Sequence, residues 1–233
     1  MTTPIPPFAA LDDILARTGH LLLDFDGVVC HLYAAHPRSL AADRLRAVLS
    51  SHGTLLPEAI IATTDPLAVL SFAATISPEL AGQADAELAD WELDAIPSAE
   101  PTGYVHDVIA SARQSGRTAT VISTCSARAV NAYLEWTNLA DLVGLAVARI
   151  PDDPASTSVP NLIRRATALL DTEPRTCAFV ARSADALDAA AKAGAAVIAY
   201  ARDPVAPASA HAGAAVTSLA DLVLRLRARP LRN

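Results

Sequence analysis

Residues 21–29 have the sequence LLLDFDGVV. The apolar run up to Leu23 predicts a buried strand, and Gly27 predicts the turn that ends it. Asp24 and Asp26 are therefore expected at the carboxyl end of a strand, which is the edge where open α/β sheets bind ligands. Because side chains alternate along a strand, the two carboxylates are expected on the same face.

Two neighbouring carboxylates have to be stabilised by their surroundings. At a separation of ~4 Å and an effective dielectric constant of ~20, they repel each other by about 4 kcal/mol. A cation, a shared proton or a hydrogen-bonded loop can offset that repulsion. The pair therefore indicates a functional site, and the alternative is an aspartate that only caps the turn after the strand.

Strand and helix patterns alternate through most of the chain. The strands are predicted at 20–25, 118–122, 145–148, 176–181 and 196–200. The helices between and beside them are predicted at 8–17, 102–115, 126–136, 160–170, 184–193 and 217–228. This alternation predicts an α/β fold with a doubly wound parallel sheet.

Residues 31–97 have only helical patterns and interrupt that alternation. Helices are predicted at about 39–51, 67–76 and 78–94. Asp65-Pro66 and Ser77-Pro78 each combine a capping side chain with a proline at the first helical position, which is a helix start signal. We therefore predict a discontinuous core domain of residues 1–30 and 98–233, with a helical domain of residues 31–97 inserted after the first strand.

The order of these features resembles the haloacid dehalogenase superfamily over nearly the whole chain, and most closely the phosphoglycolate-phosphatase-like hydrolases common in actinobacteria. The first motif of that family, Asp-x-Asp-Gly, matches residues 24–27. The resemblance implies that Asp24 is the nucleophile, that Asp26 is a general acid or base, and that the inserted helices form a C1-type cap that selects the substrate. The second motif, a strand that ends in Ser or Thr, matches residues 119–124. Gly27, Ser123 and Thr124 are thus the expected contacts for a phosphate or carboxylate group.

The third and fourth motifs depart from the family pattern. Thr157 occupies the place of the lysine of the third motif, and Lys192, the only lysine, follows the fourth motif. In the fourth motif, Arg182 and Ala186 occupy the two acidic positions. Thr157 and Arg182 are therefore included among the expected substrate or phosphate contacts.

A magnesium site is expected to be degraded. Magnesium is held by one or two carboxylates together with phosphate oxygens and water, and here a guanidinium replaces one ligand. Arg182 is expected to take the place of the metal and to pair with Asp24. We expect no cofactor; the alternative is magnesium held by Asp185 or Asp188, which are offset from the position of the family's ligand.

Composition narrows the class of protein. The chain has 233 residues, a net charge of −7 and three cysteines without metal-site spacing. The acidic balance argues against a nucleic-acid surface, and no apolar run reaches the ~18 residues of a membrane-spanning helix. The N-terminus lacks the features of a signal peptide. A cytoplasmic protein with reduced thiols and a small-molecule ligand is expected, and no protein partner is indicated.

Three functions follow from these observations. The first is an atypical enzyme that uses Asp24 and Asp26 on a small organic or phosphorylated molecule without a conventional magnesium site. The alternatives are a non-catalytic protein of the same fold that binds a ligand or partner, and an ordinary magnesium-dependent phosphatase. Tyr33 and Arg38 are candidate substrate contacts from the cap, whereas His31, His36 and Cys125 receive no role.

Overall fold

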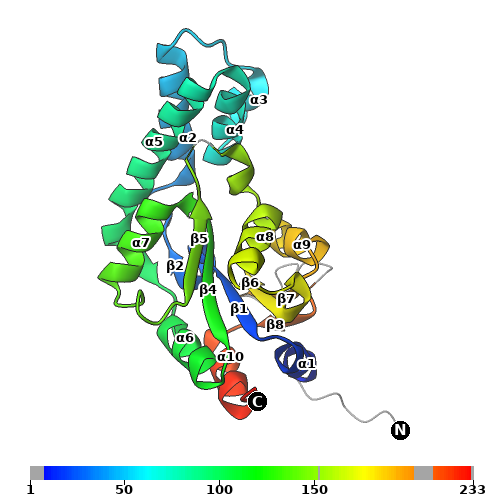
Figure 1. Cartoon of the computed structure of the whole chain (residues 1–233). Helices are drawn as coiled ribbons and strands as arrows, with labels where there is room; N and C mark the ends of the chain where they lie inside the picture. The colour runs from blue at the N-terminus through cyan, green and yellow to red at the C-terminus, as the bar shows by residue number, and fades with distance from the viewer. Residues whose placement is uncertain (1–7, 152, 202–211, 232–233) are drawn as a thin grey trace.

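A six-stranded parallel sheet forms the centre of the molecule (Figure 1). The computed structural model describes residues 8–151, 153–201 and 212–231. The strand order is β5-β4-β1-β6-β7-β8. The strands are β1 (His20–Asp24), β4 (Thr118–Ser126), β5 (Leu145–Arg149), β6 (Cys177–Ala181), β7 (Ala196–Tyr200) and β8 (Ala214–Val216). The predicted doubly wound parallel sheet is confirmed.

Helices cover both faces of the sheet (Figure 1). One face packs against α1 (Ala9–Arg17), α6 (Val105–Gln114), α7 (Ala127–Trp136) and α10 (Leu219–Ala228). The other face packs against α8 (Val159–Leu169) and α9 (Ala184–Lys192). Leu21 and Leu23 belong to the first core and Leu22 to the second. The three middle residues of β1, Leu21–Leu23, are apolar because the strand is buried on both faces.

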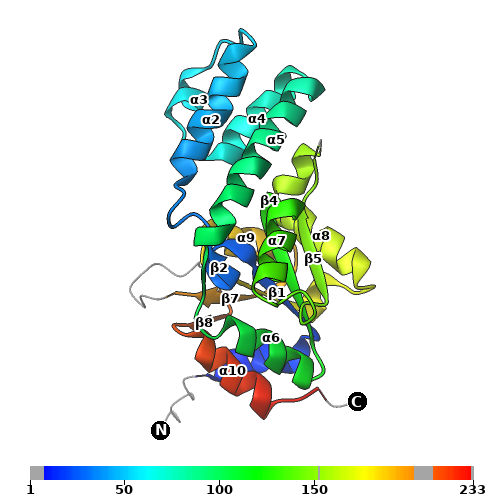
Figure 2. The same cartoon turned by 90° about the vertical axis from the view of Figure 1, so that its left-hand side faces the viewer.

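Four helices after β1 stack together at one end of the molecule (Figures 1 and 2). They are α2 (Arg38–Ser51), α3 (Glu58–Ala62), α4 (Pro66–Ile76) and α5 (Pro78–Ala95). Both predicted start signals are present: Asp65 accepts the Leu67 N–H, and Ser77 accepts the Leu80 N–H. These helices have a hydrophobic core of their own. The domain boundaries at 30/31 and 97/98 stay a prediction.

Short elements complete the described chain. A two-stranded ladder of β2 (Cys30–His31) and β3 (Glu100–Pro101) joins the two connections to the four helices. Short helical turns occur at Phe25–Val29, Ile96–Ser98, Pro154–Thr157 and Pro174–Thr176. Within the described residues, no helix combines the length and the apolar character needed to cross a membrane.

The sequence pattern missed the shortest elements. Helix α3 has five residues, β8 has three, and β2 and β3 have two each. Segments of this length show no periodicity, because a pattern needs several turns or alternations to stand out. Their positions depend on the neighbouring elements with which they pair or pack.

Candidate active site

A cleft of about 1160 Å³ lies beside the carboxyl end of β1. The sheet and the loops after it contribute Asp24, Asp26, Gly27, Thr124, Arg182 and Asp185 to its lining. The segment from β2 to the start of α4 contributes His31, Tyr33, Arg38 and Asp65. The cleft therefore combines charged side chains of both signs from two parts of the chain.

The topology of the sheet explains the place of the cleft. From β1 the chain continues to β4 and β5 on one side, and from β6 it continues to β7 and β8 on the other. The strands β1 and β6 are parallel neighbours, but the chain continues from them to opposite sides of the sheet. Open α/β sheets bind ligands at such a switch point, outside the carboxyl ends of the strands.

Asp26 lies two residues beyond the end of the strand, and its backbone is still extended, with φ −81° and ψ 115°. Strand β1 ends at Asp24, and the turn covers Phe25–Val29. The Leu32 N–H donates to Asp26 Oδ1 at 3.0 Å, which anchors this carboxylate within the loop. Both carboxylates line the same cleft; that they share one strand face stays a prediction.

Gly27 allows the chain to turn under Arg182. Its φ of +103° lies in the region that favours glycine. A Cβ atom at this position would lie 3.1 Å from Cδ of Arg182. The aliphatic part of the Arg182 side chain therefore packs directly on the backbone of the first motif.

The protein environment favours the protonated forms of both aspartates. The two side chains are partly buried, and loss of hydration raises the pKa of Asp24 to about 8, with a further contribution from the charge of Asp26. Loss of hydration also raises the pKa of Asp26, which Arg38 and the Leu32 N–H oppose. The pair therefore carries a proton at neutral pH.

Arg38 acts on both members of the pair, whereas His31 acts on Asp26. Arg38 begins α2, and its charge lowers the pKa of both Asp24 and Asp26. Its guanidinium carbon lies 4.8 Å from the centroid of the Tyr33 ring, in a cation–π contact. Arg182 lines the cleft but, among the described residues, forms no ion pair with Asp24 within 4.0 Å. The expected Arg182–Asp24 ion pair is therefore not formed.

The other expected phosphate contacts, Ser123, Thr124 and Thr157, do not lie together in the structure. Thr124 lines the cleft. The Ser123 side chain is buried, and its Oγ accepts the Cys125 N–H at 2.9 Å, so it supports the irregular carboxyl end of β4. Thr157 lines a separate cavity of about 20 Å³ together with Asp85 and Arg149. The structure thus brings Thr124 to the aspartate pair, but places Thr157 in the lining of another cavity.

The degradation of the magnesium site that the resemblance implies stays a prediction. In the part of the chain that the structure describes, no group of three or more His, Cys, Asp or Glu side chains could hold a metal ion. Asp185 lines the cleft, whereas Asp188 is not among its described lining residues. Two guanidinium groups line the same cleft, and they would oppose a bound cation.

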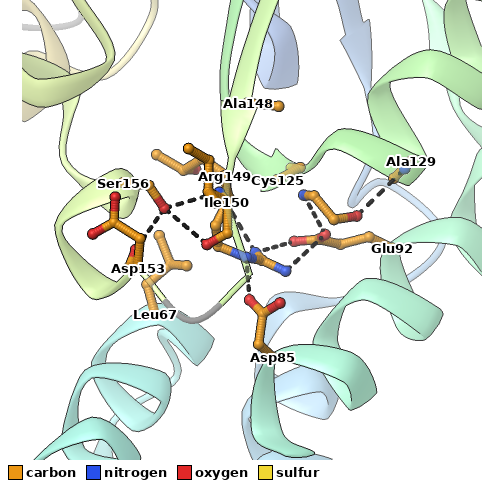
Figure 3. Close-up of polar contacts among 12 residues, drawn as sticks. Leu67, Asp85, Glu92, Cys125, Ala129, Ala148, Arg149, Ile150, Asp153 and Ser156 are labelled. Atoms are coloured by element: carbon orange, nitrogen blue, oxygen red, sulfur yellow. Dashed lines mark hydrogen bonds and ion pairs between the residues drawn. The ribbon is translucent and has the colours of Figure 1, made fainter. Parts of the chain in front are cut away.

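A buried ionic cluster around Arg149 was not predicted from the sequence. Arg149 ends β5 with a side chain that is only 1% exposed, and it pairs with Asp85 and Glu92 of α5 (Figure 3). The available signal was an arginine directly after the apolar residues of a buried strand. Such a charge is almost never fully buried without a partner.

Comparisons with known proteins identify the fold. No family model and no curated protein matches the chain, but solved structures do. CbbY from Rhodobacter sphaeroides in complex with phosphate has 18% identity and a TM-score of 0.63, and the match covers 88% of this chain and 96% of that one. A HAD phosphatase from Thermococcus onnurineus has 14% identity and a TM-score of 0.62, over 92% and 100% of the two chains. A dehalogenase with an intermediate complex has 15% identity and a TM-score of 0.61, over 88% and 96%.

These matches include a phosphatase and a dehalogenase, so the fold alone does not select the chemistry. Each match extends over nearly the full length of both chains. The chain therefore has the fold of the haloacid dehalogenase superfamily of hydrolases.

Proposed function

We propose that this protein is an atypical hydrolase that uses the Asp24–Asp26 pair on a small organic or phosphorylated molecule, without a conventional magnesium site. The observation that carries the proposal is the combination of two protonation-shifted carboxylates and two guanidinium groups in one large cleft. The three cysteines are free and buried, which agrees with a cytoplasmic location.

The pair is suited to acid–base or nucleophilic chemistry. A catalytic acid or base works best when its pKa lies near the working pH, and the pKa of Asp24 is about 8. Two interacting carboxyl groups titrate as a pair, so at neutral pH one can donate a proton while the other accepts one. A carboxylate of such a pair can also attack a substrate directly.

Arg38 and Arg182 supply positive charge to the cleft. Fixed positive groups stabilise the negative charge that develops on a transferring group, which is a major part of hydrolytic catalysis. They also favour a ligand with a phosphate or carboxylate group. The phosphate bound to CbbY agrees with a ligand of this class.

A substrate panel tests the proposal. Phosphate monoesters, small carboxylic acids and haloacids would be assayed in EDTA and again in magnesium. We expect turnover in EDTA that falls at least about 100-fold in Asp24→Asn and in Asp26→Asn, because acid–base groups contribute on that scale. Asp185→Asn is the matched control, since it removes a carboxylate that lines the same cleft but lies outside the pair.

Two outcomes would contradict the proposal. Turnover that requires magnesium and is lost in Asp185→Asn would establish a magnesium-dependent phosphatase, which the position of Asp185 in the cleft favours. Saturable binding of phosphate in calorimetry, without turnover of any panel member, would establish a non-catalytic binding protein.

A further inference from the structure

The buried cluster around Arg149 joins α5 to the edge of the sheet. Arg149 Nε donates to Asp85 Oδ1 at 2.6 Å, and its two terminal nitrogens donate to the Glu92 carboxylate at 2.9 and 3.2 Å (Figure 3). Arg149 also donates to the Thr124 carbonyl at 3.0 Å. The side chains of Arg149 and Glu92 are each 1% exposed. Breaking such a buried ion pair is costly because it leaves an uncompensated charge. The side chains of Arg149, Asp85 and Glu92 are therefore held firmly in this arrangement.

Glu92 does more than neutralise Arg149. Its Oε2 accepts the Ser126 N–H at 2.7 Å, at the residue that ends β4 and caps α7. Its Oε1 accepts the hydroxyl of Tyr33 at 3.3 Å. One carboxylate thus binds three segments that are distant in sequence: the end of β5, the end of β4 and the loop that follows β2.

Tyr33 connects this carboxylate to the cleft. Its hydroxyl donates to Glu92 Oε1 at 3.3 Å and also contacts Cys125 Sγ at 3.8 Å. The guanidinium carbon of Arg38 lies over its ring, 4.8 Å from the centroid. Tyr33 and Arg38 both line the cleft that contains Asp24 and Asp26. Continuous contacts therefore run from Glu92 through the Tyr33 hydroxyl and ring to Arg38.

We propose that Glu92 is a positioning residue: by holding the Tyr33 hydroxyl, it keeps the ring of Tyr33 and the guanidinium of Arg38 in the cleft beside the aspartate pair. Arg38 is the cation that favours the ionised form of both aspartates. Glu92 thereby controls how many protons the pair holds, although it does not touch the pair itself.

The pair has several other charged or titratable neighbours. Those that act on it or line its cleft are His31, Cys30, Tyr33, Asp65, Cys125, Arg182 and Asp185. The changes described below leave all of them in place except Tyr33. The role of Glu92 matters for catalysis only if the proposed function holds, because it concerns the same aspartate pair. Its test measures the protonation of the pair and not turnover.

The test is a titration of the aspartate carboxyl carbons by NMR, in protein labelled with ¹³C-aspartate. Spectra of Asp24→Asn and Asp26→Asn assign the two signals. In Glu92→Gln and in Tyr33→Phe we expect the pKa of Asp24 to rise by several tenths of a unit up to about one unit. A nearby opposite charge lowers a carboxyl pKa by ~1–3 units, and these variants lose part of the effect of Arg38. The double variant should shift the pKa no further than either single change, since both act through one hydrogen bond.

The direction of the shift separates positioning from a direct effect of charge. Removing the negative charge of Glu92 would by itself lower the pKa of a neighbouring carboxyl. A downward shift in Glu92→Gln would therefore overturn the proposal, as would an unchanged titration in Tyr33→Phe.

Asp85→Asn is the matched control for a purely structural role. It removes the other acidic partner of Arg149 in the same cluster, but Asp85 has no contact with Tyr33 among its hydrogen bonds. We expect a lower Tm with an unchanged titration of Asp24. An equal upward shift of the Asp24 pKa in Asp85→Asn would overturn the proposal. If Glu92→Gln does not fold, the comparison of Tyr33→Phe with Asp85→Asn tests the proposal instead. An upward shift in protein that turns over no substrate would retain this inference and reject the proposed function.

Discussion

At the scale of single residues, burial affects Asp24 more than any neighbouring charge. Loss of hydration is the largest cause of its raised pKa, ahead of repulsion from Asp26 and attraction to Arg38. A carboxyl group of this kind is stable in the folded state chiefly when it is protonated. The stability of the protein should therefore depend on pH through this group.

The first prediction concerns that pH dependence. The pKa of Asp24 rises from 3.8 to about 8 on folding, so the folded state binds the extra proton and its stability falls as pH increases through that window. At ~1.4 kcal/mol per unit, the loss between about pH 5 and pH 8 is at most about 4 kcal/mol. Asp24→Asn lacks the penalty and should be more stable than the parent at about pH 9, with a smaller difference at pH 5.

Thermal unfolding of both proteins over this pH range measures the effect. Asp13→Asn, which changes an exposed carboxylate of α1, is the control and should follow the parent. A difference in Tm between Asp24→Asn and the parent that does not grow with pH would contradict the prediction.

The second prediction concerns Gly27. Gly27→Ala should lower the free energy of unfolding by about 1–3 kcal/mol, because an L-residue is strained at this positive φ. The new methyl group would also meet Arg182 Cδ at 3.1 Å. Urea denaturation measures the loss. In Gly27→Ala/Arg182→Ala the contact is absent, so part of the loss should be recovered; recovery of none of it would show that backbone strain alone is responsible.

At the scale of elements, α5 is attached to the core by ion pairs of two kinds, buried and exposed. Arg149 binds Glu92 with both side chains 1% exposed. Arg128 of α7 binds Asp90 at 2.9 Å, with side chains 61% and 60% exposed. Exposed pairs contribute ~0–1 kcal/mol, whereas removing one member of a buried pair costs ~3–5 kcal/mol. The two pairs should therefore differ strongly in importance.

The third prediction follows from that contrast. Arg149→Met should lower the free energy of unfolding by about 3–5 kcal/mol, because Asp85 and Glu92 lose their buried counter-charge. Arg128→Met, the matched control on the exposed pair, should lower it by no more than about 1 kcal/mol. Denaturant unfolding of the two variants decides; losses of equal size would show that burial does not govern the attachment of α5.

At the scale of the whole molecule, the four helices after β1 have a core of their own but share the Arg149 cluster with the sheet. The cluster is therefore expected to couple the stability of α5 to that of the loops at the end of β4 and β5. Strands β1 and β6 lie at the centre of the sheet, and the described hydrogen bonds of Arg149 go to α5 and β4 and not to these strands.

The fourth prediction is a regional change in hydrogen exchange. In Arg149→Met, amides of α5 and of residues 123–126 should exchange faster than in the parent, whereas β1 and β6 should keep their relative protection. Mass spectrometry of peptides from these segments measures the pattern. Uniformly faster exchange through the whole chain would show a global loss of stability without a local role for the cluster.

Most elements could be predicted because their signals are local. The apolar run before Asp24, the capping residues Asp65 and Ser77, and the alternation of strands with helices depend on neighbouring residues along the chain. The site was only partly predictable, because part of it depends on contacts between residues that are not adjacent in the sequence. The sequence places Asp24 and Asp26 at a strand end, but the turn that anchors Asp26 depends on the Leu32 N–H.

Local sequence patterns were sufficient to predict the α/β architecture and a carboxylate pair at the carboxyl edge of the sheet. The cation that acts on both aspartates follows only from the packing of distant segments, because Arg38 comes from the first of the inserted helices and not from the fourth motif. The tertiary structure also placed Thr157 in a different cavity and buried Arg149 between two acids of α5. Burial and the strength of a charge depend on which distant segments pack together, and no local pattern encodes that packing.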